Sequence, residues 1–515
     1  MTDVGAAWRR VAESLETRPS LADLFAAEPD RHRRLSVETA GILFDFSKTH
    51  LSTASQAALG ALAEARGFAA RRDALLSGAI VNPTEARAAT HPAERGSGSG
   101  PAVAAAAEAK EAHRQLVERV DTGGLGDIRH IIHIGIGGSA LGPALLVDAL
   151  AHLGGRYDAH IVSNIDGVAL ERAMRQCDPA QTLVVLVSKT FTTIETLINA
   201  ESALRWMEAA GIANALGRFV AVTAAPARAT QWGIDAANIL AFAESVGGRY
   251  SLWSSVGVTA ALVIGWPGFA ALHAGAAAMD RHFAEAAPDA NAPLIAATID
   301  VLYAAFLGAE TRAVFGYDER LRLLAPFLQQ LEMESNGKRV DLTGAPVTHP
   351  TAAITCGGTG TDAQHAVFQL LHQGTHLVPA EFVMVREPGH GLDPVHHRQL
   401  IANAIAQGAA LMRGRSFEEA LAETPGDAAL AAARTFPGDR PSTTIVLDRL
   451  DPVTLGALIA FYEHRTFAAS VLLGINAFDQ MGVELGKAMA KAAASGDAQD
   501  FDASSRALLV RLTSE

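Results

Sequence analysis

The chain has 515 residues, of which 49% are hydrophobic and 19% are charged. This length predicts roughly two to four domains, and the composition excludes an intrinsically disordered protein. Lysine and arginine number 42 against 55 aspartate and glutamate residues, which gives a net charge of −13. A general electrostatic attraction to nucleic acid or acidic lipid is thereby excluded. An anionic ligand would have to be bound locally, by a few well-placed donors.

Two features bear on the compartment. The two cysteines, Cys177 and Cys356, cannot form a disulfide framework or a cysteine-based metal site, which fits a reducing compartment. The first ten residues lack the apolar segment of a secretory signal. Residues 250–279 contain no Asp, Glu, Lys or Arg, but glycines and a proline interrupt them and no basic flank sets an orientation. We therefore expect buried core helices, no membrane span and a cytoplasmic protein.

The pattern of apolar residues changes near residue 128. Residues 1–118 are predicted to be helical throughout, with a glycine–serine interruption at 96–100 and an alanine-rich helix from residue 101 to 120. Beyond Ile128, short apolar runs alternate with amphipathic stretches, which is typical of βαβ units on a parallel sheet. The strands are predicted at residues 130–134, 160–162, 183–187 and 218–222, and then at 352–355, 382–385 and 444–447.

We therefore predict an α/β protein with two doubly wound parallel-sheet αβα domains. Its predicted parts are a helical N-terminal region over residues 1–118, a first αβα domain over 119–285, a second over 286–480, and a helical C-terminal tail over 481–515.

Two turns in the first αβα domain are candidates for binding an anion. Ligands of open α/β sheets bind beyond the carboxyl ends of strands, where a turn opens a helix with unpaired backbone N–H groups. The first turn follows Ile134 and reads Gly-Ile-Gly-Gly-Ser over residues 135–139. It also satisfies the dinucleotide pattern G-x-G-x-x-A, with Asp166 further on, but this pattern alone is weak.

The second turn follows the predicted strand at 183–187 and reads Ser-Lys-Thr-Phe-Thr-Thr over residues 188–193. Thr192 and Glu195 match a capping box, which places the helix N-terminus at Thr192. Hydroxyl groups, one ammonium group and free backbone amides would converge there, as the binding of a phosphomonoester requires. The alternative is ordinary helix capping by serine and threonine.

The acid–base candidates lie in the second αβα domain. Asn336-Gly337 is a helix stop signal, which would place Glu334 in a last helical turn, where the helix dipole suits a base working near neutrality. The alternative is a solvated glutamate, and Glu332 is a competing carboxylate. If Asp362 is an N-cap, His365 is the third helical residue, near the positive end of the dipole, with its imidazole neutral. It could equally be an ordinary histidine at a helix start.

The evidence for other candidate site residues is weaker when each is taken alone. Gln480 and Lys487 are seven residues apart, so they would lie on one face of a helix. Arg249 follows a glycine pair and opens the long uncharged stretch, which suggests an anionic partner. The histidines show no H-E-x-x-H or other clustered ligand spacing, so we expect no required metal.

Taken together, these segments resemble the phosphoglucose isomerase family. The matching stretches run in family order over most of the chain: residues 82–87, 134–139, 163–167, 188–193, 246–253, 333–338, 364–365 with Gly374, 475–480 and 482–487. The resemblance implies sugar-isomerase-like domains and reversible interconversion of glucose 6-phosphate and fructose 6-phosphate without a cofactor, in glycolysis and gluconeogenesis. It also implies an obligate homodimer, because in the family the ring-opening histidine comes from the neighbouring subunit.

The resemblance assigns roles residue by residue. Glu334 would move a proton between C2 and C1, Arg249 would stabilise the enediolate, and His365 would open the sugar ring with help from Lys487. The residues that would bind the phosphate or line the site are Gly138, Ser139, Ser188, Lys189, Thr190, Thr193, Gln330 and Gln480. The chain departs from the family pattern at Ala140, Ile194 and Met481, where Asp, Gln and Trp are usual, and in residues 242–245.

Two other functions are weighed against this one. A nicotinamide-dependent dehydrogenase would explain the glycine pattern and Asp166, but it leaves the Ser188 turn, Glu334 and His365 without a purpose. A non-catalytic sugar-phosphate sensor would need the phosphate contacts but not Glu334, Arg249 and His365 together. The isomerase explains all of these residues.

Overall fold

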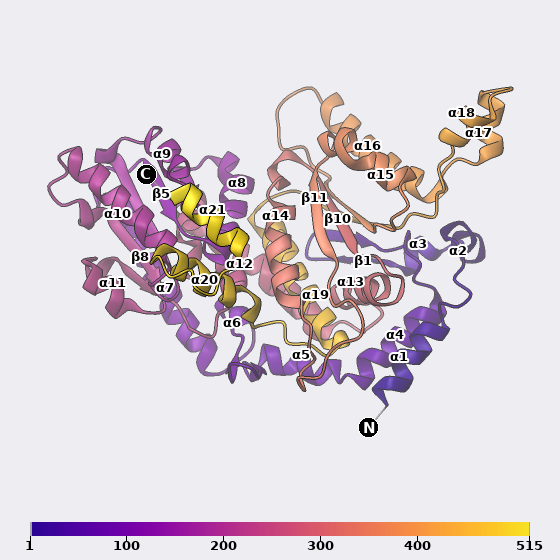
Figure 1. The fold of residues 1–515 in the computed structure, drawn as a ribbon, viewed down its shortest axis with the longest axis horizontal. Helices are drawn as coiled ribbons and strands as arrows, with labels where there is room; N and C mark the ends of the chain where they lie inside the picture. The colour runs from indigo at the N-terminus through magenta and orange to yellow at the C-terminus, as the bar shows by residue number, and fades with distance from the viewer. Residues whose placement is uncertain (1–2, 514–515) are drawn as a thin grey trace. The chain divides into compact units, whose positions relative to one another are not determined.

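The computed structural model describes residues 3–513, and the chain forms two compact units, residues 1–477 and 478–515. Among the described residues, the first unit holds two large sheets, each packed against helices, and one two-stranded sheet (Figure 1). The doubly wound α/β architecture predicted from the sequence is confirmed. The domain boundaries predicted near residues 118, 285 and 480 stay predictions.

The first sheet is entirely parallel, in the order β6-β5-β7-β8-β9. Its strands are β5 (His130–Ile134), β6 (Asp158–Val162), β7 (Thr182–Val187), β8 (Phe219–Thr223) and β9 (Ile239–Ala241). One face packs on α9 (Gly167–Met174), α10 (Ile194–Ala209) and α11 (Pro226–Trp232). The chain runs from β5 to β6 and then crosses to β7 on the other side of β5, so the strand order reverses between β5 and β7.

The second sheet is mixed, in the order β1-β2-β13-β12-β10-β11. Its parallel strands are β10 (Thr311–Tyr317), β11 (Ile354–Thr359), β12 (Ala380–Val385) and β13 (Ser442–Leu447). Aromatic rings of Phe315, Phe368 and Phe382 join the sheet to the long helices α15 (Asp362–Gln373) and α16 (Val395–Arg413). The smaller helices of this region are α14 (Leu324–Leu328), α17 (Phe417–Glu423) and α18 (Ala428–Ala433).

The prediction that residues 1–118 are helical throughout is wrong. β1 (Ser36–Thr39) and β2 (Ile42–Asp45) form a hairpin that pairs antiparallel with β13, and β3 (Ile80–Asn82) pairs with β4 (Arg87–Ala88). Ala40 and Gly41 both have positive φ, as the tight turn of such a hairpin requires. The helices of this region are α1 (Val4–Glu13), α2 (Leu21–Ala27), α3 (Arg31–Arg34), α4 (Thr53–Ala65), α5 (Phe68–Leu76), α6 (His91–Glu94) and α7 (Pro101–Asp121).

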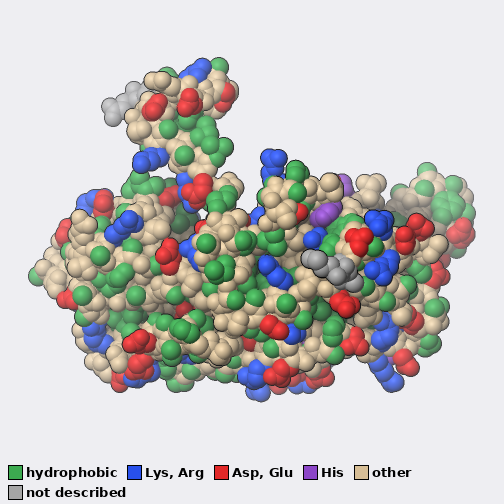
Figure 2. Space-filling model, turned by 90° about the horizontal axis from the view of Figure 1, so that it is seen from below, with side chains coloured by type: hydrophobic (Ala, Val, Ile, Leu, Met, Phe, Trp, Pro, Cys, Tyr) green, Lys and Arg blue, Asp and Glu red, His purple; other side chains and the backbone are tan. Residues whose placement is uncertain are grey.

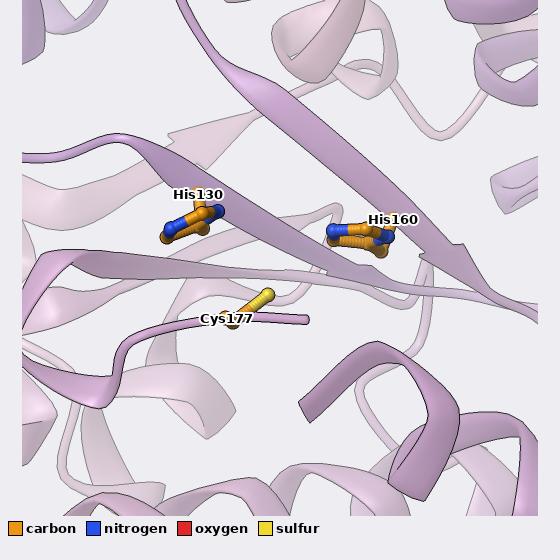
Figure 3. Close-up of side chains that lie close together, drawn as sticks. All are labelled: His130, His160 and Cys177. Atoms are coloured by element: carbon orange, nitrogen blue, oxygen red, sulfur yellow. The ribbon is translucent and has the colours of Figure 1, made fainter. Parts of the chain in front are cut away.

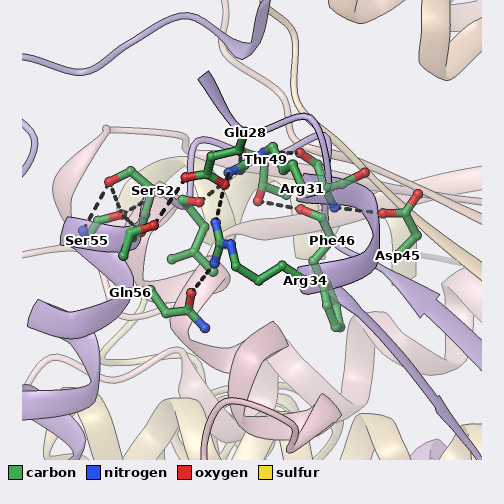
Figure 4. A network of polar contacts seen from close by, with 12 residues as sticks. Glu28, Arg31, Arg34, Asp45, Phe46, Thr49, Ser52, Ser55 and Gln56 are labelled. Carbon is green, nitrogen blue, oxygen red and sulfur yellow. Dashed lines mark hydrogen bonds and ion pairs between the residues drawn. The ribbon is translucent and has the colours of Figure 1, made fainter. Parts of the chain in front are cut away.

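A buried arginine fixes the chain that leaves this hairpin (Figure 4). The guanidinium of Arg31 is fully buried and donates hydrogen bonds to the backbone carbonyls of Ser47, Thr49 and Leu51. It also pairs with Glu28, at 3.2 Å. These bonds satisfy three carbonyl groups of an irregular segment that would otherwise be buried without a partner.

Long apolar helices lie between the two sheets. They are α12 (Val258–Glu285), α13 (Ala292–Val301) and α19 (Pro452–Leu473), and α19 packs against both of the others. Among the described residues, one helical stretch, Ser255–Glu285, is long and apolar enough to cross a membrane by length and composition. Of its most apolar window, 61% is buried inside the protein, and Gly265, with φ 73°, interrupts the helix. A core helix of a soluble protein meets the same criterion.

The second unit is helical, as predicted for the tail. It contains a short turn, η11 (Met481–Val483), and the helices α20 (Glu484–Ala494) and α21 (Ala503–Thr513).

Candidate active site

The two turns predicted to bind an anion leave neighbouring strands at the same edge of the first sheet. In the register between β5 and β7, Ile134 is paired with Leu186. The glycine turn follows Ile134 directly, and the serine–threonine turn begins at Ser188. The two turns therefore flank the point where the strand order reverses, which is where open α/β sheets bind ligands.

The glycine turn is packed too closely for any side chain. Residues Gly137–Ser139 form a short 3-10 turn, η1, and Gly137 has φ 56°. A Cβ atom on Gly138 would overlap the backbone of Gly248, and one on Gly137 would lie 3.1 Å from the amide nitrogen of Gln330. The absence of side chains at these glycines brings Gln330 and the segment leading to Arg249 against the turn.

The serine–threonine turn gathers hydroxyl groups. Buried Ser188 donates a hydrogen bond to Thr193 at 3.1 Å, and the hydroxyls of Thr190 and Thr192 are 2.7 Å apart. The helix that follows, α10, has Thr193 as its N-cap, without a side-chain capping bond. The predicted helix start at Thr192 is therefore wrong by one residue, and the predicted capping box with Glu195 does not form.

Lys189 joins this turn to the segment before Arg249. Its ammonium group donates hydrogen bonds to the backbone carbonyls of Glu244, at 2.6 Å, and of Val246, at 3.0 Å. Burial, and next the charge of nearby Arg87, lower the pKa of Lys189 to about 8, while the carboxylates of Glu244 and Glu85 oppose the shift. An ammonium with three donors keeps one for an anion after two such bonds.

Glu334 lies in the last turn of its helix, and the helix ends at Asn336, as the sequence predicts. The segment η10 (Gln329–Glu334) is π-helical, which the sequence did not indicate and which is often found at functional sites. The amide of Gln330 donates a hydrogen bond to the Oε2 atom of Glu334 at 2.9 Å. The same oxygen lies 3.6 Å from the Nη1 atom of Arg249.

Arg249 is almost fully buried within the short helical turn η6 (Gly248–Trp253). Its Nε atom donates to the hydroxyl of Ser335 at 2.7 Å, and its Nη2 atom donates to the carbonyl of Ala477 at 2.5 Å. The hydroxyls of Tyr250 and Ser335 are 2.9 Å apart. The guanidinium is thus held in one orientation, with its Nη1 atom toward Glu334.

The sequence left Glu332 and Glu334 as alternative candidates for the base, and the structure distinguishes them. Glu332 accepts hydrogen bonds from Arg312 and, at 2.6 Å, from Thr355, and its side chain is 13% exposed. It belongs to a buried ionic network with Arg465 and Glu381. Glu334 is 22% exposed and lies beside the glycine turn. Glu334 is therefore the carboxylate placed next to the candidate anion site.

His365 is exposed on the first turn of α15. The N-cap of this helix is Thr361 rather than Asp362, so His365 is its fourth residue, which corrects the prediction by one position. Within residues 3–513, His365 has no hydrogen bond or ion pair to another predicted site residue. The first unit therefore does not bring this histidine to Glu334.

Gln480 and Lys487 both belong to the second unit. The prediction that they share one helix face is wrong, because α20 begins only at Glu484 and Gln480 has a non-helical backbone. Lys487 is exposed and its ammonium group lies 3.0 Å from Glu484 in the same helix.

Sequence analysis missed the residues that hold Arg249. Ser335 and Tyr250 were part of the matched segments but carried no chemical signal, since serine and tyrosine are common in any helix end. His91 stacks on the ring of Tyr250, with centroids 4.5 Å apart, and Trp253 donates a hydrogen bond to buried Glu463 at 2.8 Å. These partners come from distant segments, which only the fold brings together.

Comparison with known proteins decides the family. Residues 45–509 match the family described as phosphoglucose isomerase. Glucose-6-phosphate isomerases from Rhizorhabdus wittichii and Zymomonas mobilis are 60% and 55% identical to this chain, over 99% and 98% of it and over 99% and 97% of their own lengths. A crystal structure of a glucose-6-phosphate isomerase from Chlamydia trachomatis is similar with a TM-score of 0.89, 30% identity and 99% coverage of both chains.

The chain belongs to the phosphoglucose isomerase family. The resemblance inferred from the sequence motifs is confirmed.

Three departures from the pattern of the phosphoglucose isomerase family fall on helix starts or on an exposed position. Ala140 is the N-cap of α8 (Leu141–Leu150), so that helix has no side-chain cap where an aspartate would supply one. Ile194 is the first residue of α10 and is 60% exposed. Met481 is exposed in the second unit.

Proposed function

We propose that this chain interconverts glucose 6-phosphate and fructose 6-phosphate, with Glu334 as the base that transfers the proton. The enzyme is an isomerase of the phosphoglucose isomerase family. The observation that carries the assignment of the base is the contact of Glu334 with Gln330 and Arg249 beside the glycine turn.

The reaction requires a base and a cation that act together. In the open-chain aldose, Glu334 removes the proton from C2, and electrons move to the C1 carbonyl oxygen, giving an enediolate. The hydroxyl proton of C2 passes to the C1 oxygen, and return of the carbon-bound proton to C1 with collapse of the C2 oxyanion to a carbonyl gives the ketose. The Nη1 atom of Arg249 stabilises the developing oxyanion, because a preorganised cation in a buried site favours the charged transition state over the neutral ground state.

The phosphate is bound at the two turns of the first sheet. Ser188, Lys189, Thr190 and Thr193 supply donors from one turn, and Gly138 supplies its backbone amide and Ser139 its hydroxyl from the other, since the amide of Ser139 already donates to the carbonyl of Ile136. Binding of this distant group orients the reacting carbons against Glu334. Gln330 orients the carboxylate by its hydrogen bond.

Replacement of Lys189 should weaken substrate binding. We expect Lys189→Ala to raise KM by about 10- to 100-fold with a smaller change in kcat, since a charge-assisted hydrogen bond is worth about 1.5–3 kcal/mol. In the parent protein, KM should rise above pH 8, because the pKa of Lys189 is about 8 and the charged form is lost as the pH increases.

Lys189→Arg is the matched control. It keeps the charge, so the rise in KM near pH 8 should disappear. Unchanged KM in Lys189→Ala would remove this residue from the phosphate site.

Ring opening is assigned to His365, with assistance from Lys487, and Gln480 lines the site. An exposed position of His365, without a side-chain hydrogen bond or ion pair within residues 3–513, supports its use in a neighbouring subunit, and hence a homodimer. We further propose that the enzyme works in the cytoplasm in glycolysis and gluconeogenesis, without a cofactor, a membrane or a nucleic acid partner. On the face shown in Figure 2, the basic side chains of the described residues are interspersed with acidic ones, which supports the last of these points.

A coupled assay tests the function directly. Fructose 6-phosphate is supplied to the purified chain, and glucose 6-phosphate is measured by NADP⁺ reduction with added glucose-6-phosphate dehydrogenase. Turnover well above the enzyme-free rate is expected, and its absence in folded protein would refute the isomerase. Titration with NADH, followed by nicotinamide fluorescence, tests the dehydrogenase suggested by the glycine pattern, and tight binding would favour that alternative.

A further inference from the structure

A group of three potential metal ligands lies on the first sheet, outside the candidate active site (Figure 3). One ring nitrogen of His130, one ring nitrogen of His160 and the sulfur of Cys177 all lie within 4.8 Å of one another. The two imidazoles come from neighbouring strands, and the sulfur comes from the segment between α9 and β7. The group uses side chains that the isomerase reaction does not need.

The register of the sheet explains why these residues meet. β5 and β6 are parallel, with His130 opposite Asp158 and Ile132 opposite His160. Because side chains alternate along a strand, His130, Asp158 and His160 lie on the same face. This is the face covered by α9 and α10, and Cys177 packs against the core between them.

The ring nitrogens that face this group are unsatisfied. The Nδ1 atom of His130 and the Nε2 atom of His160 are buried and have no hydrogen-bond partner among the described residues. The same two nitrogens lie 3.9 Å and 3.3 Å from the Oδ2 atom of Asp158. Cys177 is a free, partly buried thiol. Buried polar atoms are normally paired, so an orphaned pair facing a carboxylate and a thiol points to a missing partner.

We propose that His130, His160, Cys177 and Asp158 form a Zn²⁺ site. Imidazole nitrogen, thiolate sulfur and carboxylate oxygen are all ligands of Zn²⁺, and four such ligands complete a closed tetrahedral site. Tetrahedral zinc, with bonds of about 2.0–2.3 Å, separates its ligand atoms by roughly 3.3–3.8 Å. The two nitrogens and the sulfur lie within 4.8 Å of one another, so each of these three side chains needs to move by only about 1 Å. Asp158 lies outside this group of three, and its exposed carboxylate, already beside both imidazoles, has to turn further toward Cys177 to complete the site.

The site lies at the opposite end of the strands from the candidate active site. His130 and Asp158 are the first residues of their strands, whereas the glycine turn begins after Ile134. Five residues of parallel strand span about 16 Å. Zinc here binds no substrate and instead ties the edge strand β6 to β5 and to the segment before β7. The proposal therefore does not depend on the reaction that the enzyme catalyses.

Protons compete with the metal at this site. Burial, and next the carboxylate of Asp158, raise the pKa of the Cys177 thiol to about 11, while a hydrogen bond with Thr182 opposes the shift. Zinc must displace the thiol proton and bind neutral imidazoles, so its affinity should fall as the pH is lowered from 8 to 6.

The test uses the full-length protein, freed of metal with a chelator and titrated with Zn²⁺ against a chromogenic competitor. One equivalent should bind per chain, and Cys177→Ser or His160→Ala should lower the affinity by at least about 100-fold, more than loss of an outer-shell partner costs. Cys356→Ser is the matched control, because it removes the other cysteine, which is exposed and lies outside the group. It should bind zinc like the parent protein.

Three further measurements on the parent protein avoid reliance on variants that fold poorly. Co²⁺ should give the thiolate charge-transfer band and the intense visible bands of tetrahedral coordination. Zinc should slow alkylation of Cys177 but not of Cys356. At a free zinc concentration 100 times its Kd, the apparent folding constant should rise about 100-fold, while isomerase activity stays unchanged. Binding that survives both Cys177→Ser and His160→Ala, or no protection of Cys177 by zinc, would overturn the proposal.

Discussion

Replacement of Glu334 by glutamine should lower kcat by about 10²–10⁴-fold and leave KM within a few-fold of the parent value. Glutamine has nearly the same shape and can still contact Gln330 and Arg249, but it cannot accept a proton from carbon. Binding of the phosphate depends on other residues and should survive. Steady-state kinetics in the coupled assay, together with calorimetric titration of a non-reacting sugar phosphate, measure the two effects separately.

The neighbouring glutamate provides a matched control for this experiment. Glu332→Gln removes the same charge two residues away, but from the ionic network of Arg312 and Thr355. Glu332→Gln should lower the thermal midpoint of unfolding, because it leaves a buried arginine with fewer partners. The kcat of the folded protein should change little. If Glu334→Gln kept full activity, or if Glu332→Gln alone abolished it, Glu334 would not be the base.

The fold could be predicted where the sequence carries periodic patterns. β5, β6, β7 and β8 of the first sheet are largely apolar, since a parallel sheet is buried on both faces, and they lie within one or two residues of the predicted positions. The short edge strand β9 was not predicted. The hairpin of β1 and β2 was missed because its strands have four residues each and one side of the pair is partly exposed. Its signal was the Ala40-Gly41 turn between β-prone residues.

β10 was missed for a different reason. It contains Arg312 and Gly316 between apolar residues, so its sequence does not read as a buried strand. The structure pairs the guanidinium of Arg312 with Glu332 and Glu381, which allows a charge inside the sheet. This compensation comes from segments distant in the sequence, and no local pattern reveals it.

The candidate active site also contains some residues that the sequence could predict and others that it could not. Ser188, Lys189 and Glu334 could be proposed from the sequence, because turn chemistry and helix ends have local signatures. The pairing of Glu334 with Arg249 could not be derived from spacing, since these residues are far apart in the chain and meet only where η10 packs beside η6. The zinc ligands are a further example. His130 and His160 meet through strand pairing, which a search for clustered spacing does not detect.

Replacement of Arg249 by lysine should lower kcat/KM by about 10²–10³-fold, the range found when one donor to a developing oxyanion is removed. A single ammonium group cannot reproduce the bonds to Ser335 and Ala477 while also pointing a donor toward Glu334. Affinity for a phosphorylated hydroxamate that mimics the enediolate should fall by a similar factor, whereas affinity for phosphate alone should not. Parallel losses in kcat/KM and in analogue binding identify stabilisation of the transition state.

A variant of Ser335, which positions Arg249, tests whether Arg249 stabilises the enediolate or only supports the structure. Ser335→Ala removes the hydroxyl that holds the Nε atom of Arg249 but keeps the guanidinium itself. We expect a smaller loss, about 10-fold in kcat/KM, because the bond to Ala477 still fixes the arginine. Thermal midpoints report whether either variant is merely unstable. If Arg249→Lys lost stability and kcat/KM but bound the hydroxamate as tightly as the parent, Arg249 would hold the loop together and would not stabilise the enediolate.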